Sequence, residues 1–154
     1  MATPSPYRTL PPERRVALVL HAVRASREAR QLYAQRLVAR GGGFRPQTVL
    51  SWPPDRLAKE VVRLNAETAQ DELELLQLLY VELEPAVQTT FLDAAGVAHE
   101  NGRMGEELEP PYADAEAVRR GVAAVRAAHG EDGERYLRAL VRYSKEAWPG
   151  IEEA

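Results

Sequence analysis

The stretch from Glu13 to Arg40 contains neither glycine nor proline, and this feature narrows most strongly what the chain can fold into. Pro11 and Pro12 precede it, and proline is tolerated in the first turn of a helix. The triple glycine Gly41-Gly42-Gly43 follows it and acts as a helix stop. We therefore predict one long first helix over Glu13–Arg40, behind a Pro-rich leader of residues 1–12.

This predicted helix is apolar on two sides. At about 100° per residue, leucine and alanine side chains share one face and a second apolar set shares nearly the opposite one. The second set is Val16, Val19, Leu20 and Val23. A bundle packed on one side cannot cover both faces. Either the C-terminal helices cover the second face within a monomer or, as we favour, that face meets its own copy in a symmetric homodimer.

Helical periodicity continues beyond the glycines. A helix begins near Asp55, and whether it stops at Asn65 is left open by the pattern. Thr68–Ala95 is also helical in pattern, with Glu67, Asp71 and Glu74 expected on an exposed face. Proline has no backbone donor, so Pro85 places a kink or a break in this stretch.

An acidic loop rich in glycine and proline is predicted over residues 96–113, and it is longer than most connections within a domain. Its start, from Leu92 through Asn101-Gly102, has the pattern of a helix end followed by a specific turn. Two helices follow, the first stopped by Gly130 and the second started by Asp132, which predicts a C-terminal αα-hairpin. Close approach of a neighbour is allowed at Gly121.

The composition fits this all-α reading. Hydrophobic residues make up 45% of the chain, enough for a core, while aromatic residues are only 6% and no alternating strand pattern is found. Cysteine is absent, and no apolar run approaches the roughly 20 residues of a membrane span. We predict a single all-α domain over residues 1–154, an irregular bundle of about five helices, cytoplasmic and from a bacterium with a G+C-rich genome.

Charge is distributed in blocks along the chain. Residues 1–63 carry 12 basic and 4 acidic side chains, residues 64–116 carry 1 and 13, and residues 117–154 carry 7 and 6. Such asymmetry calls for internal pairing or for charged partners. We expect the basic first helix and the acidic middle of the chain to pack near one another.

Catalytic and cofactor signatures are not found. The glycine triplet follows a helix and lacks the strand and lysine of a phosphate loop. His21, His99 and His129 lack neighbours at metal-binding spacing: His21 fits a core position, His99 a loop and His129 a helix end. No cofactor and no metal are expected, and the carboxylates fit a solvated surface better than an acid–base pair.

Function is therefore assigned to the surface. The leading hypothesis is a non-enzymatic protein-interaction or regulatory module that binds a protein partner or itself, with no membrane partner. Alternatives are a nucleic-acid-associated regulator that uses the basic first helix, and an enzyme whose site is assembled from scattered residues. The partner-binding candidates are Arg24, Arg27, Arg30, Glu106, Glu107, Glu109 and Tyr112.

Overall fold

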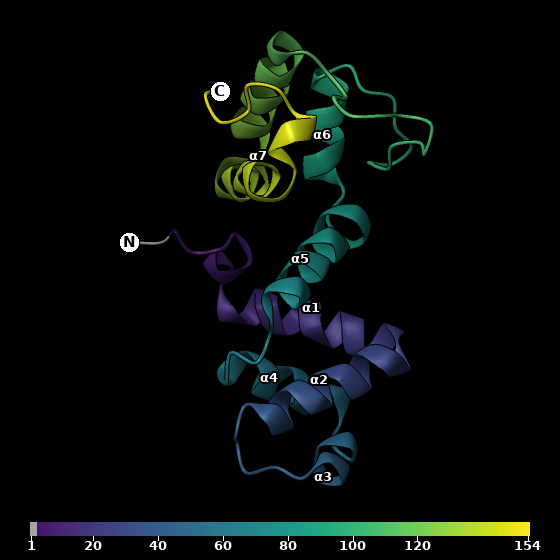
Figure 1. Ribbon diagram of the computed structural model, residues 1–154, viewed down its shortest axis with the longest axis vertical. Helices are drawn as coiled ribbons and strands as arrows, with labels where there is room; N and C mark the ends of the chain where they lie inside the picture. Colours follow the sequence, from purple (N-terminus) through teal and green to yellow (C-terminus); the bar gives the residue numbers. More distant parts are fainter. Residues whose placement is uncertain (1–2) are drawn as a thin grey trace. The chain divides into compact units, whose positions relative to one another are not determined.

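The computed structural model describes residues 3–154, and within them the chain is helical with no strand, which confirms the all-α class (Figure 1). Its α-helices are α1 (Pro12–Ala25), α2 (Arg27–Ala39), α3 (Pro46–Leu50), α4 (Pro54–Arg63), α5 (Ala69–Leu78), α6 (Ala86–Ala94) and α7 (Ala115–Ser144). The chain forms two compact units. Unit 2 is Leu10–Leu78, and unit 1 is Leu79–Ala154 together with the chain up to Thr9. The single domain remains a prediction.

The predicted long first helix is wrong, because the chain breaks at Ser26. Ser26 is extended, with φ −145° and ψ 124°, and its Oγ accepts a hydrogen bond of 3.2 Å from the Ala29 N–H. Serine is a preferred N-cap because its side chain can satisfy a donor that the first turn of a helix leaves free. The break therefore needs neither glycine nor proline, the two signals on which the prediction relied.

Unit 2 has an aliphatic core with two buried rings. Val19, Leu37 and Leu57 are fully buried, and α1, α2 and α4 pack together around such side chains. Tyr33 and Trp52 are also buried. The core thus rests mainly on leucine and valine, in keeping with the low aromatic content.

The end of α4 settles the question that the pattern left open at Asn65. Asn65 has a positive φ of 50°, and the Ala66 N–H reaches back to the Val61 carbonyl at 2.9 Å. This is the Schellman arrangement, in which asparagine can replace the usual glycine. The helix therefore stops here.

The predicted exposed acidic face is wrong at two of its three residues. Glu67 is 5% exposed and Asp71 is 1% exposed, whereas Glu74 is exposed. Asp71 Oδ2 accepts from the Thr68 N–H at 2.9 Å and from Arg36 Nε at 3.1 Å, so its charge is compensated inside the unit. This pair joins a basic helix to an acidic one, as the charge blocks led us to expect.

Burial and the carboxylates of Asp71 and Glu67 raise the pKa of the Tyr33 phenol above its ordinary value. The physical reason is that both low solvation and nearby negative charge disfavour the phenolate. Tyr33 is therefore neutral throughout the physiological pH range.

The stretch predicted as one helix with a kink or break at Pro85 is broken there. The short π-helical turn η2 (Leu79–Leu83) follows α5, and the Glu84 N–H bonds the Leu79 carbonyl at 2.7 Å. Pro85 then precedes α6 as its N-cap residue. Proline cannot donate to the helix before it, so the chain takes a new direction.

The core of unit 1 forms where α6 packs on α7. A Cβ on Gly121 would lie 2.8 Å from the Phe91 ring, so only glycine permits this approach, as predicted. Phe91 contacts Tyr136 and Trp148 edge-on at centroid distances of 5.9 and 4.9 Å, and Tyr80 contacts Tyr136 at 5.1 Å. Burial, with Tyr80 adding to it, raises the pKa of Tyr136, so its hydroxyl remains a hydrogen-bond donor.

The predicted C-terminal hairpin is a helix with a sharp bend. Gly130 has φ 51° and ψ −124°, outside the helical region, and helix runs on both sides of it. The two halves of α7 run in different directions in Figure 1, and a single residue joins them in place of the expected loop. A positive φ favours glycine because it has no Cβ, so Gly130 marks the bend.

The N-terminal segment is tied to α7. Arg135, only 7% exposed, donates from Nε to Thr9 Oγ1 at 3.0 Å and from Nη1 to Asp132 Oδ1 at 2.5 Å. This fixes η1 (Tyr7–Thr9) on unit 1. Among residues 3–154, no helix has the length and apolar content needed to cross a bilayer.

Candidate functional site

The candidate site is built on the segment between α6 and α7, beginning with the way α6 ends. The Val97 N–H bonds the Leu92 carbonyl at 2.9 Å, and both side chains are buried. This backbone arrangement satisfies a terminal carbonyl and adds an apolar contact across the helix end. The chain therefore leaves α6 in a defined direction.

A tight turn follows at Asn101-Gly102. Their φ values are 53° and 84°, and Glu100 and Arg103 exchange two backbone hydrogen bonds of 2.9 and 3.0 Å. Two central residues with positive φ make a type I′ turn, for which Asn-Gly is the preferred pair. The turn holds Glu100 and Arg103 opposite one another, and it is the specific turn that the sequence pattern predicted.

Hydrogen bonds of His99 link this turn to α6. Its Nδ1 accepts a hydrogen bond of 3.0 Å from the Gly102 N–H, so the proton of the neutral ring lies on Nε2, which donates to Asp93 Oδ1 at 2.5 Å. Gln88 Nε2 donates to the Gly102 carbonyl at 2.5 Å, and Tyr136 Oη donates to Gln88 Oε1 at 3.5 Å. Both ring nitrogens therefore hold the loop in place, and neither is left for proton transfer to a ligand.

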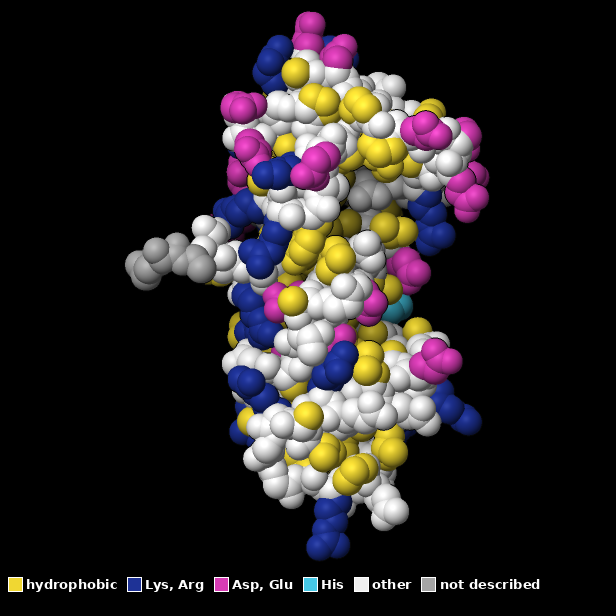
Figure 2. All heavy atoms as spheres, in the orientation of Figure 1, with side chains coloured by type: hydrophobic (Ala, Val, Ile, Leu, Met, Phe, Trp, Pro, Cys, Tyr) yellow, Lys and Arg dark blue, Asp and Glu magenta, His cyan; other side chains and the backbone are white. Residues whose placement is uncertain are grey.

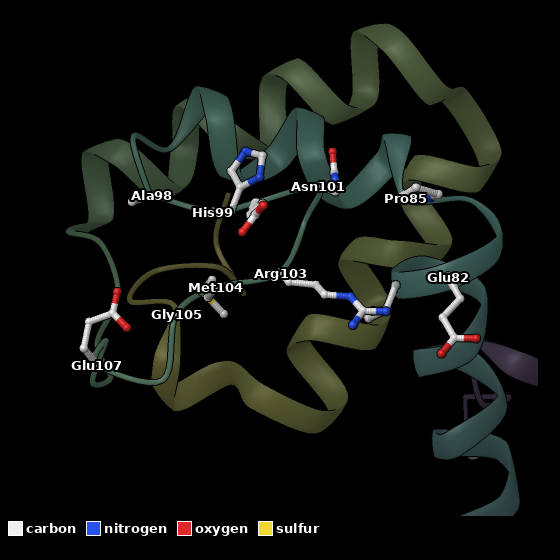
Figure 3. Close-up of a pocket in the computed structure, with 11 residues that line it drawn as sticks. Glu82, Pro85, Ala98, His99, Asn101, Arg103, Met104, Gly105 and Glu107 are labelled. Atoms are coloured by element: carbon white, nitrogen blue, oxygen red, sulfur yellow. The ribbon is translucent and has the colours of Figure 1, made fainter.

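A hollow of about 960 Å³ lies between this loop and η2 (Figure 3). Its lining comes from η2, Pro85 and the loop: Val81, Glu82, Pro85, Ala98, His99, Glu100, Asn101, Arg103, Met104, Gly105 and Glu107. Arg103 extends from the loop toward η2, and Glu107 lies at the other end of the hollow (Figure 3). The acidic hollow, as we call it below, is thus walled by residues from one unit only.

The lining is negatively charged. Three exposed carboxylates, those of Glu82, Glu100 and Glu107, face one exposed guanidinium, that of Arg103. In Figure 2 acidic side chains gather over the part of unit 1 that Figure 1 draws as this loop. Charges in such a concave wall act together on an approaching ion, so the acidic hollow attracts cations.

The predicted loop candidates fall partly on this site. Glu107 lines the acidic hollow, and Glu106 and Glu109 are exposed beside it in the same loop. Tyr112 does not join them, because its ring packs on Trp148 at a centroid distance of 5.2 Å. Its half-buried side chain is part of the core of unit 1.

Glu82, Glu100 and Arg103 were not predicted from the sequence as members of a site. One signal could have found two of them, Glu100 and Arg103. An Asn-Gly pair after a helix stop predicts a type I′ turn, which pairs the residues on either side of it. No sequence signal placed Glu82 opposite the turn.

The predicted arginine stripe is not continuous. Arg24 and Arg27 are exposed near the junction of α1 and α2. Arg30, in contrast, donates from Nη2 to the carbonyls of Leu50 and Trp52 at 2.7 and 2.8 Å. Its guanidinium is engaged with the end of α3, so the stripe loses the member that would continue it along α2.

The predicted dimer face is partly buried within the chain. Val19 is fully buried and Val23 is 4% exposed, whereas Val16 and Leu20 are half-buried. Only Val16 and Leu20 can contribute to a contact with a second copy while the chain keeps this fold. The homodimer stays a prediction, and its expected contact face is reduced to Val16 and Leu20.

Among residues 3–154, no group of three or more histidine, aspartate or glutamate side chains is placed to hold a metal ion. What the acidic hollow can do chemically follows from its parts: it can bind cationic groups through its carboxylates and aliphatic groups through Met104. Comparison of the chain with protein-family models, with curated proteins and with solved structures finds no match.

Proposed function

We propose that this protein is a non-enzymatic protein-interaction module whose contact surface is the acidic hollow. The observation that carries the proposal is how the wall is built. Both ring nitrogens of His99, the imidazole that lines the wall, already form hydrogen bonds within the chain, while the carboxylates of the wall are exposed to solvent. Rigid support beneath an exposed charged wall suits recognition better than proton transfer.

The partner that fits this wall is a basic segment of another protein. The carboxylates of Glu100 and Glu107 outnumber the single guanidinium of Arg103 on this wall, which leaves a negative surplus. Met104 lines the same wall, and Leu83, next to Glu82, is 40% exposed. Aliphatic groups between the charges of a partner would therefore also find contacts, and complementary charge would speed the encounter and depend on salt.

Binding of a fluorescent peptide of alternating Arg and Leu, measured by anisotropy, tests the proposal. The double variant Glu100→Gln with Glu107→Gln should bind about three to tenfold more weakly, since an exposed ion pair contributes roughly 0.2 to 1 kcal/mol. Glu131→Gln is the matched control, because Glu131 is exposed on α7 and does not line the hollow. Equal weakening by the control, or equal binding of a Glu and Leu peptide, would count against the proposal.

A photocrosslinking residue in place of Met104 extends the test to cells. The proposal expects a defined protein adduct from this position and none from Ala123, which is exposed on α7. The same adduct from both positions would mean that the hollow is not the contact surface.

A further inference from the structure

A second hollow, of about 330 Å³, lies in unit 1 and shares no lining residue with the acidic hollow. Its floor is aliphatic: Val122 is 3% exposed, Leu137 is 5% exposed and Ile151 is 6% exposed, and Val141 is half-buried beside them. Its sides come from both ends of the described chain, with Pro4 at one edge. We call it the α7 groove.

Two rows of side chains run along the C-terminal half of α7 into this groove. Leu137 and Val141 are four residues apart, and so are Arg138 and Arg142. Residues at this spacing lie one above the other on a helix. An aliphatic row therefore runs next to a row of two guanidinium groups.

The acidic side chains that line the α7 groove already have cationic partners. Glu134 Oε1 accepts from Arg126 Nε at 2.5 Å, and Glu152 pairs with Lys145 Nζ at 3.2 Å. Arg138 and Arg142 are exposed, and neither forms an ion pair within the described residues 3–154. Once these pairs are made, the guanidinium groups of Arg138 and Arg142 place two positive charges beside an apolar floor, against one negative charge from the Ala154 carboxyl, whose oxygen accepts from Arg126 Nη1 at 3.3 Å.

We propose that the α7 groove binds a carboxylate that carries an aliphatic chain, of which a medium-chain fatty acid is the simplest example. The chain lies on the floor formed by Val122, Leu137 and Ile151, and the carboxylate lies at the two guanidinium groups. The volume falls within the range of small-molecule sites. Arginine is suited to this role because its planar, always charged guanidinium group can donate two parallel hydrogen bonds to one carboxylate.

The test is a titration of the whole chain with decanoate below its micelle concentration, followed by methyl NMR. We expect saturable shifts at Val122, Leu137 and Val141. Each methylene that is buried contributes roughly a factor of four in affinity, so octanoate should bind up to about fifteenfold more weakly. Decyltrimethylammonium has the same chain with the opposite charge and should bind at least about fivefold more weakly than decanoate.

Two variants locate the head group. Arg138→Gln with Arg142→Gln should weaken decanoate binding about fivefold or more, whereas Arg119→Gln, at an exposed position of α7 outside the groove, should leave it unchanged. Circular dichroism checks that each variant is folded. These arginines are exposed, so the variants are expected to fold.

Three results would overturn the inference: no methyl shift at millimolar decanoate, equal affinity for the cationic amphiphile, or equal binding by the double arginine variant. The outcome is independent of the proposed protein interaction. Decanoate binding is measured by methyl shifts of residues in the α7 groove, while peptide binding is tested by variants of the acidic hollow, and the two sites share no residue.

Discussion

The buried carboxylate of Asp71 provides the sharpest test of how unit 2 is held together. It is 1% exposed and performs two tasks. With Thr68 it forms a reciprocal cap at the start of α5: its Oδ2 accepts from the Thr68 N–H, and its own N–H donates to Thr68 Oγ1 at 3.2 Å. It also accepts from Arg36 Nε at 3.1 Å, which joins α5 to α2. The substitution Asp71→Ala removes both interactions.

The expected cost follows from these two tasks. Loss of a cap costs about 1 kcal/mol, and a lost hydrogen bond to a charged group costs about 1.5 to 3 kcal/mol, so Asp71→Ala should lower the free energy of unfolding by about 2 to 4 kcal/mol. Asp71→Asn keeps an oxygen for the Thr68 N–H and should cost about 1 to 2 kcal/mol. Arg36→Met should cost about 1 to 3 kcal/mol, because it leaves the buried carboxylate of Asp71 without its cation, although the Arg36 side chain is itself 32% exposed.

The assay is urea unfolding followed by tryptophan fluorescence. The chain has two tryptophans, Trp52 in unit 2 and Trp148 in unit 1, so the Trp148→Phe background reports on the unit that contains Asp71. Glu74→Ala is the control, as Glu74 is exposed on the same helix, and it should cost less than about 0.5 kcal/mol. If Asp71→Ala costs no more than this control, the reasoning about the cap and the ion pair is refuted.

Four further outcomes are expected. Gly121→Ala should destabilise the chain by about 1 to 3 kcal/mol, because the new Cβ meets the Phe91 ring, and a gain in the midpoint of urea unfolding would contradict the packing. Ser26→Ala should cost about 1 kcal/mol in the same assay, and no change would mean that the Ser26 cap is unimportant. Because folding raises the pKa of Tyr33, the stability that this group contributes is present at neutral pH and is lost as the pH rises above about 10. In unfolding curves measured from pH 7 to 11, the free energy of unfolding of Tyr33→Phe should therefore fall less steeply with pH than that of the parent chain. If the chain dimerises through the narrowed face, Leu20→Glu should convert the dimer to a monomer in sedimentation, and a monomeric parent chain would refute the homodimer.

Helical class and several helix ends could be predicted from the sequence because they depend on local chemistry. Pro85 breaks its helix through a missing donor, Gly130 marks a bend that only a positive φ allows, and Gly121 admits Phe91. The break at Ser26 could not be predicted in the same way. Serine is tolerated within helices as well as at caps, so the choice between the two depends on what the helix packs against.

The candidate site was harder to predict because its members come from separate segments. Glu82 lies on η2 before a break, whereas Glu100 and Arg103 are paired by a turn after α6. Whether these three residues come close together depends on the direction that the chain takes after Pro85 and after Val97. Hydrophobic periodicity carries no information about that direction. The predicted Glu107 was found only because its loop is unusually acidic.

The hydrogen bonds of the arginines explain why the basic block of the sequence does not form a continuous basic surface. Several of them donate to carbonyls at helix ends: Arg30 to Leu50 and Trp52, Arg40 to Leu64, Arg120 to Ala94, and Arg135 to Thr9. A cation is favoured at a helix C-terminus by the helix dipole and by the unsatisfied carbonyls, so this use of arginine stabilises the fold. Arginines engaged in this way are not available to form a continuous surface for phosphates. Carboxylates have no comparable role at these helix ends, and those of the loop therefore stay at the surface, which supports the proposal that the acidic hollow is the contact surface.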